Sequence, residues 1–336
     1  MKTLVVAPSW IGDTLIAQPL LMRLAEQGAQ IDVLAPGWSS PLFARMPEVR
    51  RVIESPYKHG DFAFFARRAQ GKSLAAEGYE QAIVLPNSWK SALVPFFAGI
   101  PRRIGYKGEA RRGLLNQIHH LDKAAMPQLA QRYAALAQPP GTPLREPLPQ
   151  PRLTSTSQQQ RATRVALQLP TEVQPFIFCP GAEYGPAKRW PARHFAELAR
   201  RLATEETPVW LLGSEKDTAT GDEIAALAGC RHVVNLCGRT RLDQAIDLLA
   251  GASWVISNDS GLMHVAAALD RPLIALYGSS SPGYTPPLSN HAKILSLNLE
   301  CGPCFKRDCP LPADKLRCLE DLSPKQVLAA MNSVRL

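Results

Sequence analysis

The sequence lacks the features that would place its 336 residues in a membrane or on a secretory route. No run approaches the roughly 18 to 20 apolar residues that a bilayer-spanning helix requires. The opening segment, MKTLVVAPSWIGDTL, has no basic region, no long apolar stretch and no small-residue cleavage site of the kind found in signal peptides. We therefore expect a cytoplasmic protein.

Motifs of several function classes are also missing. The first apolar run is not followed by G-x-G-x-x-G, which argues against a dinucleotide-dependent dehydrogenase. The formal charge of +9 favours an anionic partner, which is nucleic acid, a phosphorylated substrate or an anionic membrane surface. Because there is no Lys/Arg-rich tail, zinc-finger spacing or RNP-like aromatic strand, nucleic acid is the least favoured of the three.

Apolar, β-branched runs alternate with segments of helical periodicity, which predicts parallel sheets covered by helices. Strands are expected at 3–7, 31–35, 51–54, 81–85, 176–179, 209–212, 233–235, 254–257 and 273–277. Helices are expected at 15–25, 62–76, 192–203, 222–228, 242–250 and 261–269.

A proline-rich stretch divides this pattern in two. Residues 138–153, QPPGTPLREPLPQPRL, carry too many prolines for a helix or a central strand. We predict an α/β protein with one Rossmann-like, doubly wound domain at 1–150 and a second at 151–336, facing a central cleft. The last helix is expected to be able to pack back on the first domain. In such folds, ligands bind at the carboxyl ends of the strands.

The first motif, Ser9-Trp10-Ile11-Gly12-Asp13, follows the first predicted strand and opens a helix. Backbone N–H groups at a helix start can bind an anion, and Gly12 permits the close approach of a ligand. Asp13 has two interpretations. It is either an acid stabilised by the helix dipole or a general base for a substrate hydroxyl.

Two motifs in the second half predict a diphosphate site. Residues 180–191, PGAEYGPAKRWP, join a strand to a helix, and Lys188 and Arg189 supply positive charge beside accessible amides. A surface turn with two solvated cations is the alternative. Residues 257–267, SNDSGLMHVAA, place small residues at a helix start. There Asp259 would orient Lys188, fix the turn or meet ligand hydroxyls, and His264 is either a packing residue or a ligand contact.

Together these motifs resemble glycosyltransferase family 9, the bacterial lipopolysaccharide heptosyltransferases of the GT-B fold. The resemblance covers essentially the whole chain. It is carried by WIGD at 10–13, LPNSWKSALVPFFAGIPRRIGY at 85–106, KRWP at 188–191, NDSGLMHVAAAL at 258–269 and CGPCFKRDCP at 301–310. It implies an inverting transfer of heptose from ADP-heptose to the first heptose of heptosyl-Kdo-lipid A in inner-core synthesis. It also implies peripheral contact with the inner membrane.

The resemblance assigns roles to individual residues. Asp13 matches the proposed base, and Lys188 matches the lysine on the donor phosphates. Thr240 aligns with a position facing adenine, and Glu215 aligns with the region that meets the ribose. The donor-binding residues implied are Gly181, Glu183, Tyr184, Lys188, Glu215, Thr240, Asp259, Ser260, Gly261 and His264. The first-stage enzyme of the family has threonines where this chain has Glu183 and Tyr184, so no hydroxyl contact is expected from Glu183.

The mechanism that this resemblance implies is a single displacement. Asp13 removes a proton from an acceptor hydroxyl, which attacks the anomeric carbon while Lys188 and amides near Gly261 meet the leaving diphosphate. The chain contains no D-x-D motif, so we expect no catalytic metal and no required cofactor. The acceptor carries phosphates and carboxylates, and its expected ligands are Ser9, Gly12, Lys90, Arg102, Arg103 and Lys107. A solvated basic face is the alternative for these cations.

Four of the seven cysteines lie close together near the C-terminus. They are Cys301, Cys304, Cys309 and Cys318. Their spacing is compatible with one tetrahedral, structural Zn²⁺. Reduced thiols in a packed loop, or disulfides formed on purification, are the alternatives. A catalytic metal is not expected here, because nothing in the sequence ties this segment to the predicted site.

Other functions use the same motifs. A heptosyltransferase of another stage, another nucleotide-sugar transferase or a nucleotide-sugar epimerase would share the fold, since fold alone does not fix function. A non-catalytic nucleotide-binding adaptor would keep the phosphate loops but would have no need of Asp13.

Overall fold

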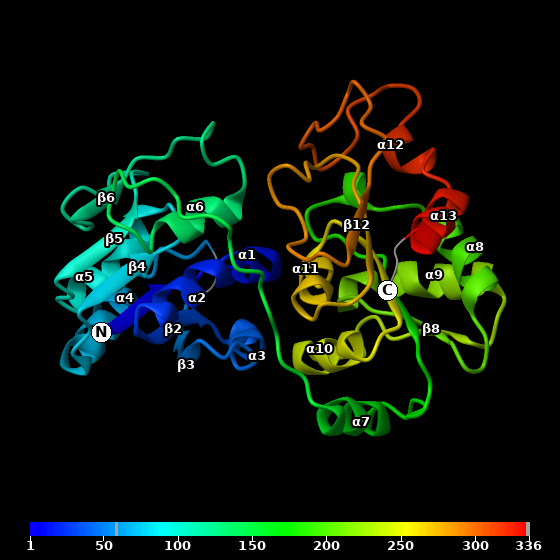
Figure 1. The fold of residues 1–336 in the computed structure, drawn as a ribbon, viewed down its shortest axis with the longest axis horizontal. Helices are drawn as coiled ribbons and strands as arrows, with labels where there is room; N and C mark the ends of the chain where they lie inside the picture. Colours follow the sequence, from blue (N-terminus) through cyan, green and yellow to red (C-terminus); the bar gives the residue numbers. More distant parts are fainter. Residues whose placement is uncertain (58–59, 334–336) are drawn as a thin grey trace. The chain divides into compact units, whose positions relative to one another are not determined.

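The computed structural model describes residues 1–57 and 60–333. The chain divides into two compact units, Met1–Pro151 and Arg152–Leu336, and each is built around a six-stranded sheet (Figure 1). The predicted α/β class with two Rossmann-like domains is confirmed. Within the described residues, no helix has both the length and the apolar character needed to cross a bilayer.

Unit 1 has strands paired in parallel in the order β3-β2-β1-β4-β5-β6. The strands are β1 (Lys2–Val6), β2 (Gln30–Pro36), β3 (Val49–Ser55), β4 (Gln81–Val84), β5 (Arg102–Tyr106) and β6 (Gln117–His119). The helices are α1 (Ile11–Ile16), α2 (Gln18–Glu26), α3 (Ser40–Phe43), α4 (Phe64–Leu74), α5 (Leu93–Phe97) and α6 (Leu129–Ala135). This is the strand order of a Rossmann fold, in which the chain reverses direction across the sheet between β1 and β4.

Unit 2 repeats the same topology, with the parallel order β12-β11-β10-β7-β8-β9 and the reversal between β7 and β10. Its strands are β7 (Phe176–Cys179), β8 (Val209–Leu211), β9 (Val233–Asn235), β10 (Trp254–Asn258), β11 (Leu273–Leu276) and β12 (Ala292–Leu295). Its helices are α7 (Ser157–Ala166), α8 (Ala192–Leu202), α9 (Thr218–Ala228), α10 (Leu242–Ala250), α11 (Gly261–Ala268), α12 (Arg317–Glu320) and α13 (Pro324–Ser333).

The core of unit 2 explains where the last helix lies. α13 packs on α8 and β11. Its Val327 and Met331 belong to the same buried cluster as Trp190 and Phe195. The apolar face of α13 is therefore buried inside unit 2. Packing of this helix on the first domain stays a prediction.

Residues 138–153 form no helix or strand, as the prolines predict. Both ends of the stretch are nevertheless fixed. Arg23 of α2 donates to the carbonyl oxygen of Pro147 at 3.2 Å within unit 1. The backbone N–H of Leu153 donates to the carbonyl oxygen of Ala268 at 2.8 Å within unit 2.

Two departures from the predicted elements have local causes. The helix expected at 15–25 is divided into α1 and α2 at Ala17, because Pro19 cannot continue the hydrogen bonding of α1. β5 was missed because two arginines begin it, which gives its first residues none of the apolar character of a buried strand.

Candidate active site

The predicted diphosphate loops meet because of the topology of unit 2. β7 and β10 are neighbours at the point of reversal, so the loops that follow them lie at one edge of the sheet. Asn258, the buried last residue of β10, connects these loops. Its Nδ2 donates to the carbonyl oxygen of Pro180 at 2.7 Å, and its Oδ1 accepts from the backbone N–H of Trp190 at 3.0 Å. One side-chain amide thus holds both ends of the 180–190 loop.

A buried ion pair lies between these loops. Lys188 Nζ is 2.5 Å from Asp259 Oδ2, and the side chain of Asp259 is only 5% exposed. The hydroxyl of Ser280 donates to the same carboxylate oxygen. Asp259 is therefore positioned to orient Lys188, which is one of the interpretations that the sequence allows. A lysine held in this way directs positive charge to the edge of the sheet where a diphosphate can bind.

The start of α11 adjoins this ion pair. Ser260 precedes the helix and its side chain makes no capping bond, so the first backbone N–H groups are not consumed by a cap. His264, in the first turn, is buried. Burial lowers its pKa to about 4, a shift that Asp259 opposes and Lys188 reinforces. His264 is therefore neutral near pH 7.

Gly181 is required by the close approach of Asp217. A Cβ atom at Gly181 would lie 2.4 Å from a carboxylate oxygen of Asp217. Asp217 accepts hydrogen bonds from the backbone N–H and the hydroxyl of Ser214, and a guanidinium nitrogen of Arg189 lies 3.7 Å away. The two cations predicted for the loop therefore have different partners. Lys188 pairs with Asp259, and Arg189 faces Asp217.

Other predicted donor residues lie in loops along the same edge of the sheet. Glu215 follows β8, Thr240 follows β9, and Glu183 forms an ion pair with Lys216. Since neighbouring strands are about 4.8 Å apart, the edge from β10 to β9 spans roughly 15 Å. The predicted donor residues thus form a row along the edge, with Lys188 and Asp259 at one end and Thr240 at the other.

The segment that carries the C-terminal cysteines backs the phosphate loop. The carbonyl oxygen of Arg307 accepts from the N–H of Ala187 at 3.0 Å. The hydroxyl of Tyr184 donates to the carbonyl oxygen of Phe305 at 2.7 Å, and Arg307 Nε donates to the carbonyl oxygen of Tyr184 at 2.7 Å. Our expectation that nothing ties this segment to the site was therefore wrong. The contacts join residues about 120 positions apart, and sequence patterns do not report such contacts.

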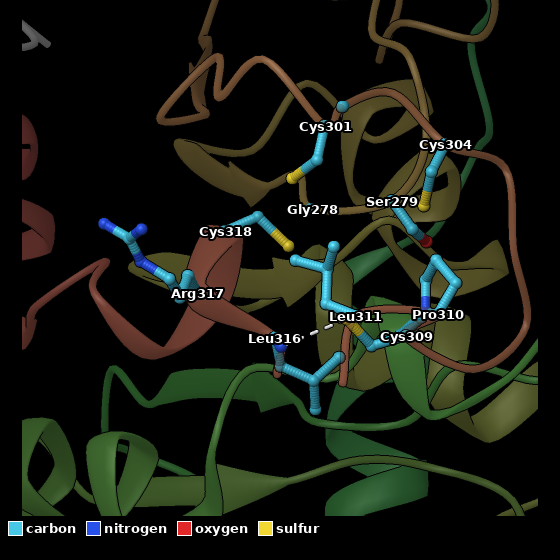
Figure 2. A pocket seen from close by; sticks show the side chains of 12 residues that line it. Gly278, Ser279, Cys301, Cys304, Cys309, Pro310, Leu311, Leu316, Arg317 and Cys318 are labelled. Carbon is cyan, nitrogen blue, oxygen red and sulfur yellow. Dashed lines mark hydrogen bonds between the residues drawn. The ribbon is translucent and has the colours of Figure 1, made fainter. Parts of the chain in front are cut away.

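The four cysteines line a small pocket of about 30 Å³, which has no room for a nucleotide (Figure 2). Each is a free thiol. Burial, together with the three neighbouring cysteines, raises the pKa of Cys318 to about 11. Figure 2 shows Leu311 among the residues that line this pocket together with the four cysteines. Among residues 1–57 and 60–333, no group of three or more Cys, His, Asp or Glu side chains is arranged to hold a metal ion. The structural zinc stays a prediction.

In unit 1, the carboxyl edge of the sheet gathers part of the predicted acceptor site. Ser9, Gly12 and Asp13 follow β1, and Asp13 lies in the first turn of α1. Lys90 lies on a 3₁₀ turn after β4, and Lys107 follows β5. All five residues therefore lie at the carboxyl edge of the sheet, where ligands bind in this fold.

Arg102 and Arg103 are not brought to that edge. They begin β5, so in a parallel sheet they lie at the opposite edge from Asp13. The guanidinium of Arg103 also has structural partners, since it donates to the carbonyl oxygens of Leu114 and Ile100 at 2.6 and 2.7 Å. The prediction treated this basic run as one surface because it did not recognise β5.

Comparison with known proteins decides the family. Residues 67–314 match the family described as Glycosyltransferase family 9 (heptosyltransferase).

The chain belongs to glycosyltransferase family 9.

Relatives that match this family 9 glycosyltransferase along its whole length support the same assignment. Lipopolysaccharide heptosyltransferase 2 of Escherichia coli K12 is 47% identical over 349 residues, covering 100% of this chain and 99% of the relative. Lipooligosaccharide heptosyltransferase 2 of Haemophilus influenzae is 46% identical, with 99% of both chains covered. The solved structure of E. coli ADP-heptose lps heptosyltransferase II is 44% identical, with a TM-score of 0.88 over 99% of this chain and 98% of that chain. The two-domain GT-B fold is confirmed.

Several residues of this family 9 site were not assigned from the sequence. Asn258 was part of a recognised motif but received no role, and Ser280, Asp217 and Arg307 were not predicted as site residues. For Ser280 there was a signal, because a run of three serines at 279–281 follows a strand that was predicted correctly. The pattern placed these hydroxyls at the carboxyl edge but could not identify which one contacts Asp259.

Proposed function

We propose that this family 9 glycosyltransferase is a heptosyltransferase II, which transfers heptose from ADP-heptose to the first heptose of heptosyl-Kdo-lipid A. Its full-length relatives are heptosyltransferases 2 of lipopolysaccharide and lipooligosaccharide, which supports the second heptose addition. The solved E. coli relative is an ADP-heptose lps heptosyltransferase, which supports ADP-heptose as the donor. In this chain, the observation that carries the proposal is the Lys188–Asp259 ion pair at the start of α11, at the topological reversal of unit 2.

Unit 2 binds the donor in this proposal. The diphosphate lies against Lys188 and the first N–H groups of α11, near Gly261. The nucleoside extends along the edge of the sheet toward Glu215 and Thr240. A row of roughly 15 Å fits an extended nucleoside diphosphate, because the row runs across three strand spacings. As the glycosidic bond breaks, charge accumulates on the diphosphate, and Lys188 stabilises it.

Unit 1 binds the acceptor and supplies the base. Asp13 accepts the proton of the acceptor hydroxyl, whose oxygen attacks the anomeric carbon from the face opposite ADP. The bond to ADP breaks in the same step, so the configuration inverts. Lys90 and Lys107, at the same edge, contact the acidic groups of the acceptor. Arg102 and Arg103 are no longer part of this proposed acceptor site, because they lie at the other edge.

The proposal requires no metal cofactor for transfer. Its support is the absence of a D-x-D motif from the sequence and the provision of positive charge by Lys188 and the α11 N-terminus. Residence at the cytoplasmic face of the inner membrane, by peripheral contact, is part of the same proposal, because the acceptor is anchored by lipid A.

The test is incubation with ADP-heptose and three acceptors carrying no heptose, one heptose or two heptoses, with products read by mass spectrometry. Addition of one heptose to the mono-heptosylated acceptor alone is expected. Transfer to the acceptor without heptose would instead assign the first stage. Binding of ADP without turnover of any acceptor would favour a nucleotide-binding adaptor.

Asp13→Asn separates the two interpretations of Asp13. If it is the base, kcat falls by about 10² to 10⁴ while the fold is retained. If Asp13 only stabilises α1 through the helix dipole, activity is nearly unchanged and the free energy of unfolding falls by about 0.3 to 1 kcal/mol. Single-turnover rates and urea unfolding of the same preparation distinguish these outcomes.

A further inference from the structure

Unit 1 carries a continuous group of six aromatic side chains, of which three are exposed and three are half-buried. We define the aromatic patch as Phe62, Phe64, Phe65, Trp89, Phe96 and Phe97. Phe65 is 83% exposed, Phe62 51% and Phe96 41%. Exposed aromatic residues that occur singly need no explanation, but a contiguous apolar patch on a folded protein indicates a surface that contacts something.

Ring contacts join the members of the patch into one cluster. The ring centroid of Phe62 lies 5.2 Å from that of Trp89 and 5.9 Å from that of Phe64. The ring of Phe64 lies 5.6 Å from Phe65 and 5.7 Å from Phe97, which in turn is 5.4 Å from Phe96. The aromatic patch is therefore a single surface built from two segments that are far apart in the sequence.

Close packing of α4 on α5 holds this surface together (Figure 1). Gly71 of α4 faces α5, and a Cβ atom there would lie 2.6 Å from Phe97 Cβ and 2.7 Å from the carbonyl oxygen of Val94. The two helices therefore touch backbone to backbone at Gly71. The rings of Phe64 and Phe65 on α4, and of Phe96 and Phe97 on α5, therefore extend from two closely packed helices.

Cations surround the aromatic patch. The guanidinium of Arg68 lies 5.9 Å from the ring of Phe97, and that of Arg103 lies 5.6 Å from the ring of Phe96. Phe65, Arg68 and Lys72 are at helical positions i, i+3 and i+7 of α4, so they share one face of the helix. Two acids also adjoin the patch. Asp61 precedes Phe62, and the carboxylate of Glu109 accepts from the backbone N–H of Trp89 at 3.1 Å. Exposed rings flanked by lysine and arginine are the combination that binds an anionic lipid surface, because the rings enter the interface while the cations contact phosphates.

We propose that the aromatic patch docks unit 1 on an anionic lipid bilayer. Phe62, Phe65 and Phe96 enter the interfacial layer, and Arg68 and Lys72 contact lipid phosphates. The inference rests on the proposed function in one respect, which is that the acceptor is anchored by a lipid. The position of Trp89 connects the aromatic patch with the proposed acceptor site. It lies on the turn after β4, at the carboxyl edge that also carries Asp13, so the patch adjoins the edge where the acceptor sugar is expected.

Vesicle flotation tests the docking surface directly. The full chain is mixed with vesicles of neutral phosphatidylcholine, or with vesicles that also contain phosphatidylglycerol. Preferential flotation with the anionic vesicles is expected. Phe65→Ser/Phe96→Ser should lower the partition coefficient by about tenfold or more, because two exposed rings leave the interface. Arg68→Gln/Lys72→Gln should lower it roughly fivefold per cation on anionic vesicles, with little change on neutral ones.

A matched control comes from unit 2. Val165 on α7 is 62% exposed and lies outside the aromatic patch, so Val165→Ser should float like the unmodified chain. Equal flotation of the unmodified chain and Phe65→Ser/Phe96→Ser would overturn the proposal. A second result would also overturn it: the unmodified chain does not bind vesicles but forms a dimer in sedimentation velocity, and the double substitution abolishes that dimer. That result would assign the patch to a second copy of the chain.

Activity on two forms of acceptor separates this proposal from the function itself. Phe65→Ser/Phe96→Ser should transfer heptose normally to a deacylated, soluble acceptor and more slowly to the same acceptor embedded in vesicles. Equal loss on both acceptors would overturn the docking role. If the unmodified chain transfers heptose to neither, the proposed function fails, while flotation still decides whether the patch binds lipid.

Discussion

Lys188→Ala is the substitution that best tests the donor site. Lys188 contributes a positive charge 2.5 Å from the Asp259 carboxylate, at the loop where the diphosphate is proposed to leave. Groups that meet charge developing in a transition state are each worth about 10² to 10³ in rate, or roughly 3 to 4 kcal/mol. We expect kcat/KM to fall by that factor and the affinity for ADP to weaken.

The same substitution has a structural cost that must be measured separately. It removes the cation beside the carboxylate of Asp259, which is 5% exposed and still accepts from the hydroxyl of Ser280. Removing one partner of a buried ion pair costs about 3 to 5 kcal/mol, because the remaining charge is left without compensation. Urea unfolding measures this cost, and Lys188→Ala/Asp259→Asn should recover part of it, because the buried charge is then absent. Activity should not recover, since the cation is still missing.

Ser280→Ala provides the matched control. It removes the hydroxyl donor to Asp259 but keeps the charge of Lys188. Stability should therefore fall by about 1.5 to 3 kcal/mol, while kcat/KM changes by no more than about fivefold. If Lys188→Ala and Ser280→Ala reduced kcat/KM equally, Lys188 would be only a structural partner of Asp259. Retention of kcat/KM within about fivefold in Lys188→Ala would refute the leaving-group role outright.

Three further predictions follow from burial and packing. Stability should fall by about 2 kcal/mol between pH 7 and pH 5 through His264, because the unfolded chain takes up a proton below its ordinary pKa of 6.5, whereas the folded chain does so only near pH 4. An equally steep pH dependence in His264→Asn, measured by urea unfolding, would contradict this. Gly71→Ala should destabilise unit 1 by about 1 to 3 kcal/mol, since the added methyl group meets α5, whereas Ser73→Ala on the exposed face of α4 should be near neutral. Elemental analysis under reducing conditions should find about one zinc per chain if the four C-terminal cysteines bind it; a metal-free protein with free thiols would end that prediction.

The elements that the sequence predicted well are those with strong periodicity and clear neighbours. The helix at 242–250 and the strand at 176–179 match α10 and β7, because apolar residues mark both and their flanking turns are distinct. The phosphate loops were found for the same reason, since each follows a buried strand. The bond from Lys188 to Asp259 follows from the strand order, which brings loops about 70 residues apart to one edge.

The failures have two other physical causes. Arg102 and Arg103 begin a strand near solvent, where charge does not interfere with pairing but removes the apolar signal. The contact of Arg307 with Tyr184 depends on tertiary packing over more than a hundred residues, and no local pattern encodes it. The sequence pattern therefore predicts which loops lie at the carboxyl edges of the two sheets, but not the residues that support those loops from behind.

The support of the phosphate loop by the end of the chain has a consequence for how this protein is synthesised. The indole N–H of Trp190 donates to the carbonyl oxygen of Leu322, and the loop before it bonds to Arg307. A nascent chain that ends before the segment 301–322 already contains every proposed donor ligand, from Gly181 to His264, but lacks the residues that support the loop from behind. We therefore expect nucleotide affinity to appear only at the final stage of translation, so that incomplete chains do not sequester the donor.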